Sequence, residues 1–252
     1  MKKIFPWGVA TLVCACATVT MPALKEGLVE FYGSQKNIFE TGRADPLVPV
    51  AAMSGHAGAY GVGALAGLDG EITVYEGKPY VTKVRGSGYT LSNTSDAAAV
   101  FAVWTKSSKW TEEPVPPNVQ GYQDLQTFVK TRAAAAGIDV SKPFPFLMSG
   151  TPLEVKWHIN VDLTEGRPIN PQLFTKSKAN YIAKNEPMKI VGFYSENHAG
   201  VFISAFAPAI KDKTAKNAIH IHMVAKDGKS AGHIDDFQFG TDMKLRLPAS
   251  DG

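Results

Sequence analysis

Three of the six histidines of this 252-residue chain lie close together, at positions 220, 222 and 233. The segment A-I-H-I-H-M-V-A (218–225) alternates like a β-strand, so His220 and His222 should project from the same face. Asp227-Gly228 is a typical hairpin turn. A second strand that starts near His233 would then return this residue beside the first pair. The sequence therefore predicts that three imidazoles converge on one point.

Three neutral imidazoles with an open fourth position form a catalytic zinc arrangement, which manganese, iron or nickel also suit. An isolated H-x-H pair also occurs as two ordinary polar residues on a half-exposed strand, and the third histidine at hairpin distance favours the metal site. Asp235 should share the face of His233 and Asp236 should face away, so either is a solvated strand end or a carboxylate that orients a ligand. We expect His56 and His198, which are scattered, to be ordinary residues.

Composition excludes one class of function and predicts a compartment. The 26 Lys and Arg nearly balance the 23 Asp and Glu, so no concentrated basic face supports nucleic-acid binding. Lys2 and Lys3 precede an apolar run, which is typical of a secretory signal peptide. We expect a signal peptide at 1–23, an exported domain at 24–252 located in the periplasm or secreted, and no stable membrane span.

The cysteines support the same interpretation. Cys14 and Cys16 are the two cysteines of the chain and both fall inside the predicted signal peptide. The exported domain should therefore contain neither a structural disulfide nor a thiolate metal site. A lipid anchor on Cys16 is the less favoured alternative to cleavage.

The remaining pattern predicts an α+β fold with mixed or largely antiparallel sheets and few helices. Residues 71–84 indicate a β-hairpin, 97–106 a buried strand and 122–137 the clearest helix. Further strands are expected within 144–150, 153–163, 189–195, 200–206, 218–225 and 233–240, and a loop at 112–119. The Gly- and Ala-rich segment 54–71 lacks the spacing of a phosphate-binding loop, because no G-K-[ST] follows it and no strand clearly precedes it.

Three segments together resemble the α-acetolactate decarboxylase family: G-V-G-A-L-A-G-L-D-G-E-I-T-V-Y-E-G-K-P-Y (61–80), I-V-G-F (190–193) and the histidine segment 220–239. The resemblance extends from about Phe31 to the final M-K-L-R-L-P-A-S. Its most specific parts are L-D-G-E and the H-x-H-x10-H arrangement that ends in G-H-x-x-D. They occur in the order and at the spacing of the family.

The resemblance implies an acetolactate-decarboxylase-like fold and a zinc-dependent carboxy-lyase of acetoin biosynthesis. Its substrate would be (S)-2-acetolactate or a related 2-hydroxy-3-keto acid, and its products acetoin and carbon dioxide. It implies His220, His222 and His233 as zinc ligands and Glu71 as a pocket carboxylate that positions water or relays a proton. Metal chelation would stabilise the enolate that forms when carbon dioxide leaves.

The chain departs from the family pattern at three supporting positions. His158 stands where the family has an arginine, and Lys156, two residues earlier on the same strand face, is a candidate to supply the lost charge. Ala64 replaces a threonine seven residues before the glutamate. A glutamate that the family carries after L-R-L-P has no counterpart in the printed sequence. We therefore expect His158 and Lys156 to act with Glu71 as catalytic residues, with the metal ligands intact.

Two alternatives to the decarboxylase remain open. One is a different reaction on another small keto or hydroxy acid, and the other is an exported metal-binding protein of the same fold without lyase activity. For the decarboxylase and for the enzyme with a different reaction, the expected partner is a small-molecule keto acid. A homodimer is one assembly that the sequence allows, because open sheet edges often pair.

Overall fold

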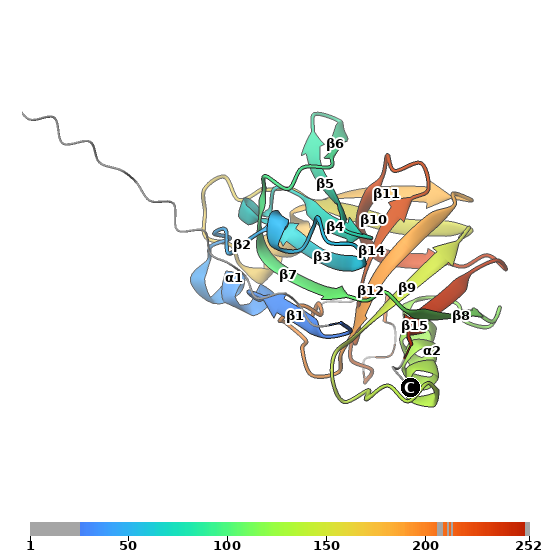
Figure 1. The fold of residues 1–252 in the computed structure, drawn as a ribbon. Coiled ribbons are helices and arrows are strands. Elements are labelled where there is room, and N and C mark those ends of the chain that lie inside the picture. The colour runs from blue at the N-terminus through green and yellow to red at the C-terminus, as the bar shows by residue number, and fades with distance from the viewer. Residues whose placement is uncertain (1–25, 206–208, 211, 213, 250–252) are drawn as a thin grey trace, which may run out of the picture.

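Two packed antiparallel sheets form most of the protein (Figure 1). The computed structural model describes residues 26–205, 209–210, 212 and 214–249. The seven-stranded sheet has the order β1-β7-β3-β4-β5-β6, with β2 also paired to β7, and comprises β1 (Val29–Tyr32), β2 (Val48–Pro49), β3 (Ala59–Leu65), β4 (Glu71–Tyr75), β5 (Lys78–Arg85), β6 (Gly88–Ser92) and β7 (Ala98–Lys106).

The eight-stranded sheet carries the histidine hairpin in its middle. Its order is β11-β10-β14-β13-β12-β9-β15-β8, with β8 (Trp110–Pro114), β9 (Phe144–Gly150), β10 (Glu154–Asn160), β11 (Lys178–Lys184), β12 (Met188–Tyr194), β13 (Ile219–Ala225), β14 (Ala231–Gln238) and β15 (Lys244–Pro248). The helices are α1 (Gln35–Thr41), α2 (Tyr122–Ala135) and α3 (Pro171–Lys176), with short 3-10 turns η1 (Val50–Ala52) and η2 (Ala66–Leu68).

Every pairing between the named strands is antiparallel, so the predicted fold class is confirmed. The predicted signal peptide, including Cys14 and Cys16, lies outside the described residues, and the domain boundary at 24 stays a prediction. Within the part of the chain that the structure describes, no helix is long and apolar enough to cross a membrane.

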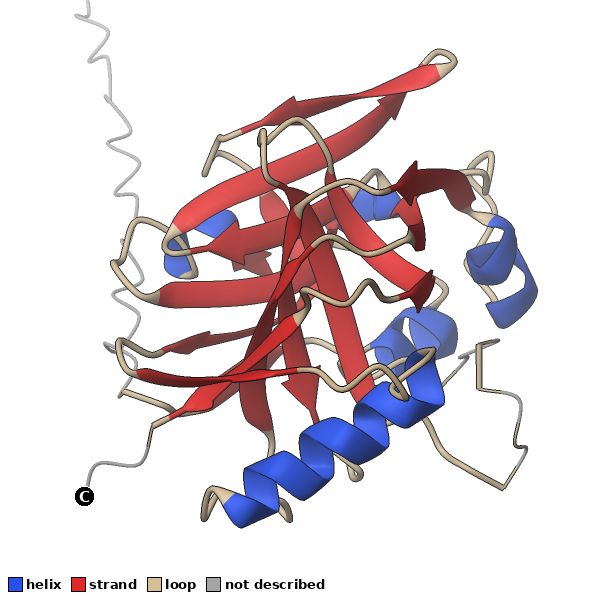
Figure 2. Cartoon of the chain, turned by 90° about the vertical axis from the view of Figure 1, so that its right-hand side faces the viewer, coloured by secondary structure: helices blue, strands red, loops and turns tan. Residues whose placement is uncertain are grey.

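The packing explains which face of the eight-stranded sheet holds the site. Its outer face is covered by α2, whose Leu125, Val129 and Ala133 join the largest apolar core (Figure 2). Its inner face meets the seven-stranded sheet through a smaller core that includes Val62, Val191 and further buried residues. Side chains that point inward from both sheets therefore meet in a layer that excludes water.

The Gly-rich segment 54–71 contains a strand that the sequence did not predict. All residues of β3 are buried, and the strand lies between β7 and β4. A Cβ on Gly63 would lie 2.5 Å from the carbonyl oxygen of Phe101, so only glycine permits this approach to β7. The glycines obscured the alternation that normally marks a strand.

Two further expectations were wrong. The predicted strand at 200–206 is replaced, over its described residues, by turns with one isolated bridge between Ala199 and Ile203. The predicted loop at 112–119 begins inside β8, which pairs with β15. Both segments are short. Whether each of them forms a strand depends on a neighbouring partner strand rather than on its local sequence pattern.

Candidate active site

The histidine hairpin forms as predicted. β13 and β14 are antiparallel, and His222 lies directly opposite His233. His220 and His222 project from one face of β13, whereas Ile219, Ile221 and Met223 join the core under α2. One nitrogen from each of the three imidazoles lies within 4.8 Å of the others.

The outer nitrogens of two rings are already occupied. Nδ1 of His220 donates to the carbonyl oxygen of Phe202 at 2.6 Å, and Nδ1 of His222 lies 3.0 Å from the Thr73 hydroxyl on β4. The two Nε2 atoms face each other at 3.1 Å. Because His220 holds its proton on Nδ1, its Nε2 presents a lone pair toward the centre of the group.

Burial keeps these imidazoles neutral. It lowers the pKa of His220 to about 4 and lowers the pKa of His222 and His233 well below the ordinary value, with smaller contributions from the neighbouring histidines. A neutral imidazole is the form that binds a metal ion. The three rings are therefore ready to ligate without first losing a proton.

Glu71 enters the same layer from the opposite sheet. It is the first residue of β4, and Gly70 before it has φ 142°, where a Cβ would lie 2.1 Å from the carbonyl oxygen of Thr82. This explains the glycine of L-D-G-E. The carboxylate lies 3.7 Å from Nε2 of His222 and, through its other oxygen, 3.7 Å from Nε2 of His158. Burial raises the pKa of Glu71 well above its usual range.

His158 is held by a carboxylate and a lysine. Nδ1 of His158 lies 2.6 Å from Asp235, whose other oxygen accepts from Lys178 at 3.4 Å. The register between β10 and β14 shifts at Lys156, which leaves Asp235 as an extra residue on β14. Such a bulge re-aims a side chain. Although burial raises the pKa of Asp235, the hydrogen bond from His158 and the charge of Lys178 lower it overall.

A second group of potential ligands, His158, His233 and Asp235, overlaps the first through His233. Its His158–Asp235 pair is already joined by a hydrogen bond, and Lys178 places a positive charge beside the carboxylate. A dication would have to displace both contacts. The triad of His220, His222 and His233 is therefore the better metal site.

The structure separates the predicted supporting residues. His158 lies beside Glu71, whereas the exposed Lys156 pairs with Asp236 at 3.3 Å and does not line the cavity. Lys156 projects from the same face of β10 as His158, as strand alternation predicts. It lies outside the buried layer between the two sheets, however, and is exposed. Ala64 pairs with Glu71 across β3 and β4 and brings no hydroxyl to it.

Sequence reasoning missed Thr73, Asn160 and Lys178. Thr73 lies two residues after Glu71, on the same strand face, and this spacing was a usable signal. Asn160 stands two residues after His158 by the same rule, opposite Lys178 on β11. Lys178 itself carries no local signal, because β11 reaches the site only by pairing with β10.

A small cavity of about 20 Å³ lies against this group. Its lining comes from both sheets and both short helices: Gln35, Glu71, Phe101, His158, Asn160, Phe174, Lys178, Ser204, His220 and His233. This volume is about that of one water molecule. A branched keto acid is several times larger, so its binding requires lining side chains to move.

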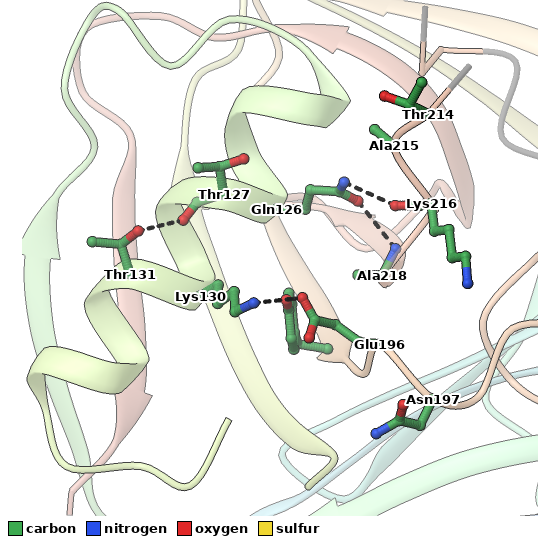
Figure 3. Close-up of a pocket in the computed structure, with 11 residues that line it drawn as sticks. Gln126, Thr127, Lys130, Thr131, Glu196, Asn197, Thr214, Ala215, Lys216 and Ala218 are labelled. Carbon is green, nitrogen blue, oxygen red and sulfur yellow. Dashed lines mark hydrogen bonds and ion pairs between the residues drawn. The ribbon is translucent and has the colours of Figure 1, made fainter. Parts of the chain in front are cut away.

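A larger hollow of about 600 Å³ lies elsewhere, between α2 and the segment that leads into β13 (Figure 3). Several of its polar groups are bonded to neighbouring protein groups. The Gln126 amide donates to the carbonyl oxygen of Lys216 and accepts from the backbone N–H of Ala218, and Lys130 donates to Glu196 at 2.6 Å. This groove, which we call the α2 groove, fastens the start of the histidine strand to the helix.

Comparisons with known proteins agree with this architecture. The sequence model of the family described as alpha-acetolactate decarboxylase matches residues 31–144. No curated protein sequence matches the chain.

Similar solved structures include alpha-acetolactate decarboxylase from Bacillus subtilis strain 168 (TM-score 0.66, 15% identity, 88% of this chain and 85% of that one). The enzyme from Bacillus subtilis subspecies spizizenii has a TM-score of 0.65 and 14% identity, over 88% of this chain and 86% of that one. A Staphylococcus aureus protein of unknown function, similar to alpha-acetolactate decarboxylase, has a TM-score of 0.65 and 16% identity over the same shares.

The two antiparallel sheets, with a buried group of histidines and a glutamate between them, thus agree with the alpha-acetolactate decarboxylase family model and with the solved structures of that name. The predicted resemblance is confirmed: the family model matches residues 31–144, and the chain has the fold of the solved alpha-acetolactate decarboxylases.

Proposed function

We propose that this protein is a zinc-dependent decarboxylase that converts (S)-2-acetolactate, or a related 2-hydroxy-3-keto acid, to acetoin and carbon dioxide. The observation that carries the proposal is the meeting of the His220 and His222 Nε2 atoms at 3.1 Å beside His233. Two ligand nitrogens on one tetrahedral zinc ion lie about 3.3 Å apart, given zinc–nitrogen bonds of about 2.0–2.1 Å. The donor group therefore fits zinc, and another divalent transition metal would also fit.

The three imidazoles would hold the ion, and the remaining coordination positions would be open to substrate. When bound, zinc supplies Lewis-acid stabilisation of the negative charge that develops on the substrate oxygens. Neutral ligands leave the full charge of the ion available for this purpose. The Thr73 hydroxyl and the Phe202 carbonyl fix the ring orientations of His222 and His220.

Glu71 is the residue best placed to move a proton. Loss of carbon dioxide breaks the bond between the carboxylate carbon and C2 and leaves the electron pair in an enediolate, which must take a proton on carbon. Burial favours the protonated form of Glu71, so this residue can hold a proton within the water-poor layer. Its carboxyl group lies between the metal-ligand candidate His222 and His158, 3.7 Å from Nε2 of each.

His158 is a positioning residue for Glu71. Its Nδ1–H donates to Asp235, which leaves Nε2 as an acceptor that faces the Glu71 carboxyl group at 3.7 Å. This arrangement would orient the protonated carboxyl group of Glu71. Burial lowers the pKa of His158, so a neutral ring stands where an arginine would carry a permanent charge.

The test combines metal analysis with product release. Purified protein should contain about one transition-metal ion per chain and release acetoin from racemic acetolactate above the spontaneous rate. A protein with both His220→Ala and His222→Ala should lose both properties. Wild type without a stoichiometric metal would overturn the proposal.

A second function rests on a specific departure from the family pattern. With His158 at the arginine position and Ala64 beside Glu71, the protein would hold the metal in the same fold but catalyse a different reaction, or none. Metal-loaded protein that releases no acetoin would favour this alternative.

A further inference from the structure

One wall of the small cavity carries polar side chains that belong neither to the proposed metal ligands nor to Glu71. It is formed by Asn160 on β10, Lys178 on β11 and Gln35 at the start of α1. Asn160 and Lys178 are directly opposed across β10 and β11. The wall lies beside the three histidines, because the same cavity also touches His220 and His233.

Lys178 has donors to spare. Its side chain is 22% exposed, and its ammonium group lies 3.4 Å from one oxygen of Asp235. Asp235 in turn accepts from His158 at 2.6 Å, so its negative charge is already shared. An ammonium group has three donors, and among the residues that line the cavity Lys178 is the one lysine or arginine.

Two buried amide oxygens on this wall lack partners within the part of the chain that the structure describes. Asn160 and Gln35 are each 4% exposed, and within the described residues neither side-chain oxygen has a hydrogen-bond partner. A buried polar group without a partner destabilises the fold. Such groups persist where a ligand supplies the missing bond, and an amide can turn to present either its oxygen or its NH₂ group.

We propose that Lys178, Asn160 and Gln35 form the subsite that binds the carboxylate of the substrate. The Lys178 ammonium group contacts one carboxylate oxygen, and the amides complete the hydrogen bonds around it. This subsite sets specificity for acids over the corresponding neutral ketones and diols. The inference rests on the proposed function for the identity of the substrate, but binding alone can test it.

The experiment uses two probes that cannot lose carbon dioxide productively: 2,3-dihydroxy-2-methylbutanoate, which carries the carboxylate, and butane-2,3-diol, which lacks it. Isothermal titration of the full-length protein with each probe gives an acid-to-diol preference. Lys178→Met should weaken binding of the acid about tenfold or more and leave binding of the diol unchanged, since a charged hydrogen bond is removed. Lys178→Arg should restore most of the preference.

Two further variants secure the result. Lys184→Met removes an exposed lysine of the same strand, which is paired with Glu154, and should keep the wild-type preference. Asn160→Asp preserves size but adds a negative charge, so it should weaken binding of the acid more than binding of the diol. The subsite is wrong if Lys178→Met and Asn160→Asp, both folded by circular dichroism, keep the wild-type preference.

The outcome is separable from the fate of the proposed function. If wild type releases no acetoin but Lys178→Met selectively loses the acid, the subsite stands and the decarboxylase does not. If acetoin is released while both variants keep their preference, the decarboxylase stands and the subsite is overturned.

Discussion

The small histidine cavity and the α2 groove differ in every property that a search for a functional site could use. The groove is about thirty times larger by volume, at about 600 Å³ against 20 Å³, and lies at the surface. The cavity lies between the two sheets and gathers titratable groups from β4, β10, β11, β13 and β14.

The difference lies in which polar groups remain available. In the α2 groove, Gln126, Lys130 and Glu196 are bonded to neighbouring protein groups (Figure 3). In the cavity, imidazole nitrogens face each other and the Asn160 amide oxygen has no partner among the described residues. Buried polar groups that lack hydrogen-bond partners therefore indicate the functional site better than the volume of a hollow does.

A Glu→Gln substitution should have its largest effect on activity in the histidine cavity, at Glu71, and its smallest in the α2 groove, at Glu196. Glu71→Gln keeps size but removes the proton that the proposed mechanism needs, so acetoin release should fall about 100- to 10,000-fold. Metal content should stay near wild type, because the three imidazoles remain. Steady-state kinetics with elemental analysis checks both, and a Glu71→Gln protein of wild-type rate would remove Glu71 from the mechanism.

A smaller effect, on metal affinity, is expected at Thr73, which orients the metal-ligand candidate His222 from the opposite sheet. Thr73→Val removes the hydroxyl that contacts Nδ1 of His222, and metal affinity should fall about 10- to 100-fold. Competition with a chelator measures this affinity. Thr82→Val is the matched control, because the buried Thr82 hydroxyl has no partner within the described residues. Equal affinities in the two variants would contradict the role of Thr73.

In the groove, Gln126→Leu should affect stability rather than chemistry. The change strips the buried N–H of Ala218 of its acceptor, which should lower the free energy of unfolding by about 1–3 kcal/mol. Thermal unfolding followed by circular dichroism gives the loss, and elemental analysis of the folded variant should still find the metal. Loss of metal from the folded variant would make the groove part of the site.

Glu196→Gln should give the smallest effect, and one that depends on pH. The hydrogen bond from Lys130 holds the pKa of Glu196 below its usual range, so the pair stabilises the fold above the unfolded pKa and loses this as pH falls through the folded value. Both side chains are about half exposed, so the effect at pH 7 should stay below about 1 kcal/mol. The difference in free energy of unfolding between wild type and Glu196→Gln should be smaller at about pH 3 than at pH 7. Acetoin release by the variant should equal that of wild type.

The histidine hairpin was predictable because each step was local. Alternation set the face of His220 and His222, and Asp227-Gly228 set the return to His233. Glu71 needed the family resemblance, since a glutamate that starts a strand is otherwise unremarkable.

The rest of the cavity depends on tertiary arrangement. Lys178 and Gln35 reach the site from β11 and α1, and no spacing along the chain connects them with the hairpin. Asp235 faces His158 through a bulge that depends on how β14 registers with β10. Lys156 shows the complementary error, because a strand pattern gives the side of a residue but not whether the other sheet covers it.

The contact between Thr73 and His222 joins residues 149 positions apart, on different sheets. Contacts of such long range generally form late in folding, because much of the chain must first be ordered. The β13–β14 hairpin can form early and bring its histidines together, but Thr73 and Glu71 arrive only when the sheets dock. Full metal affinity would then belong to the completed fold alone, so that loading with metal reports that folding has finished and favours the native state over its precursors.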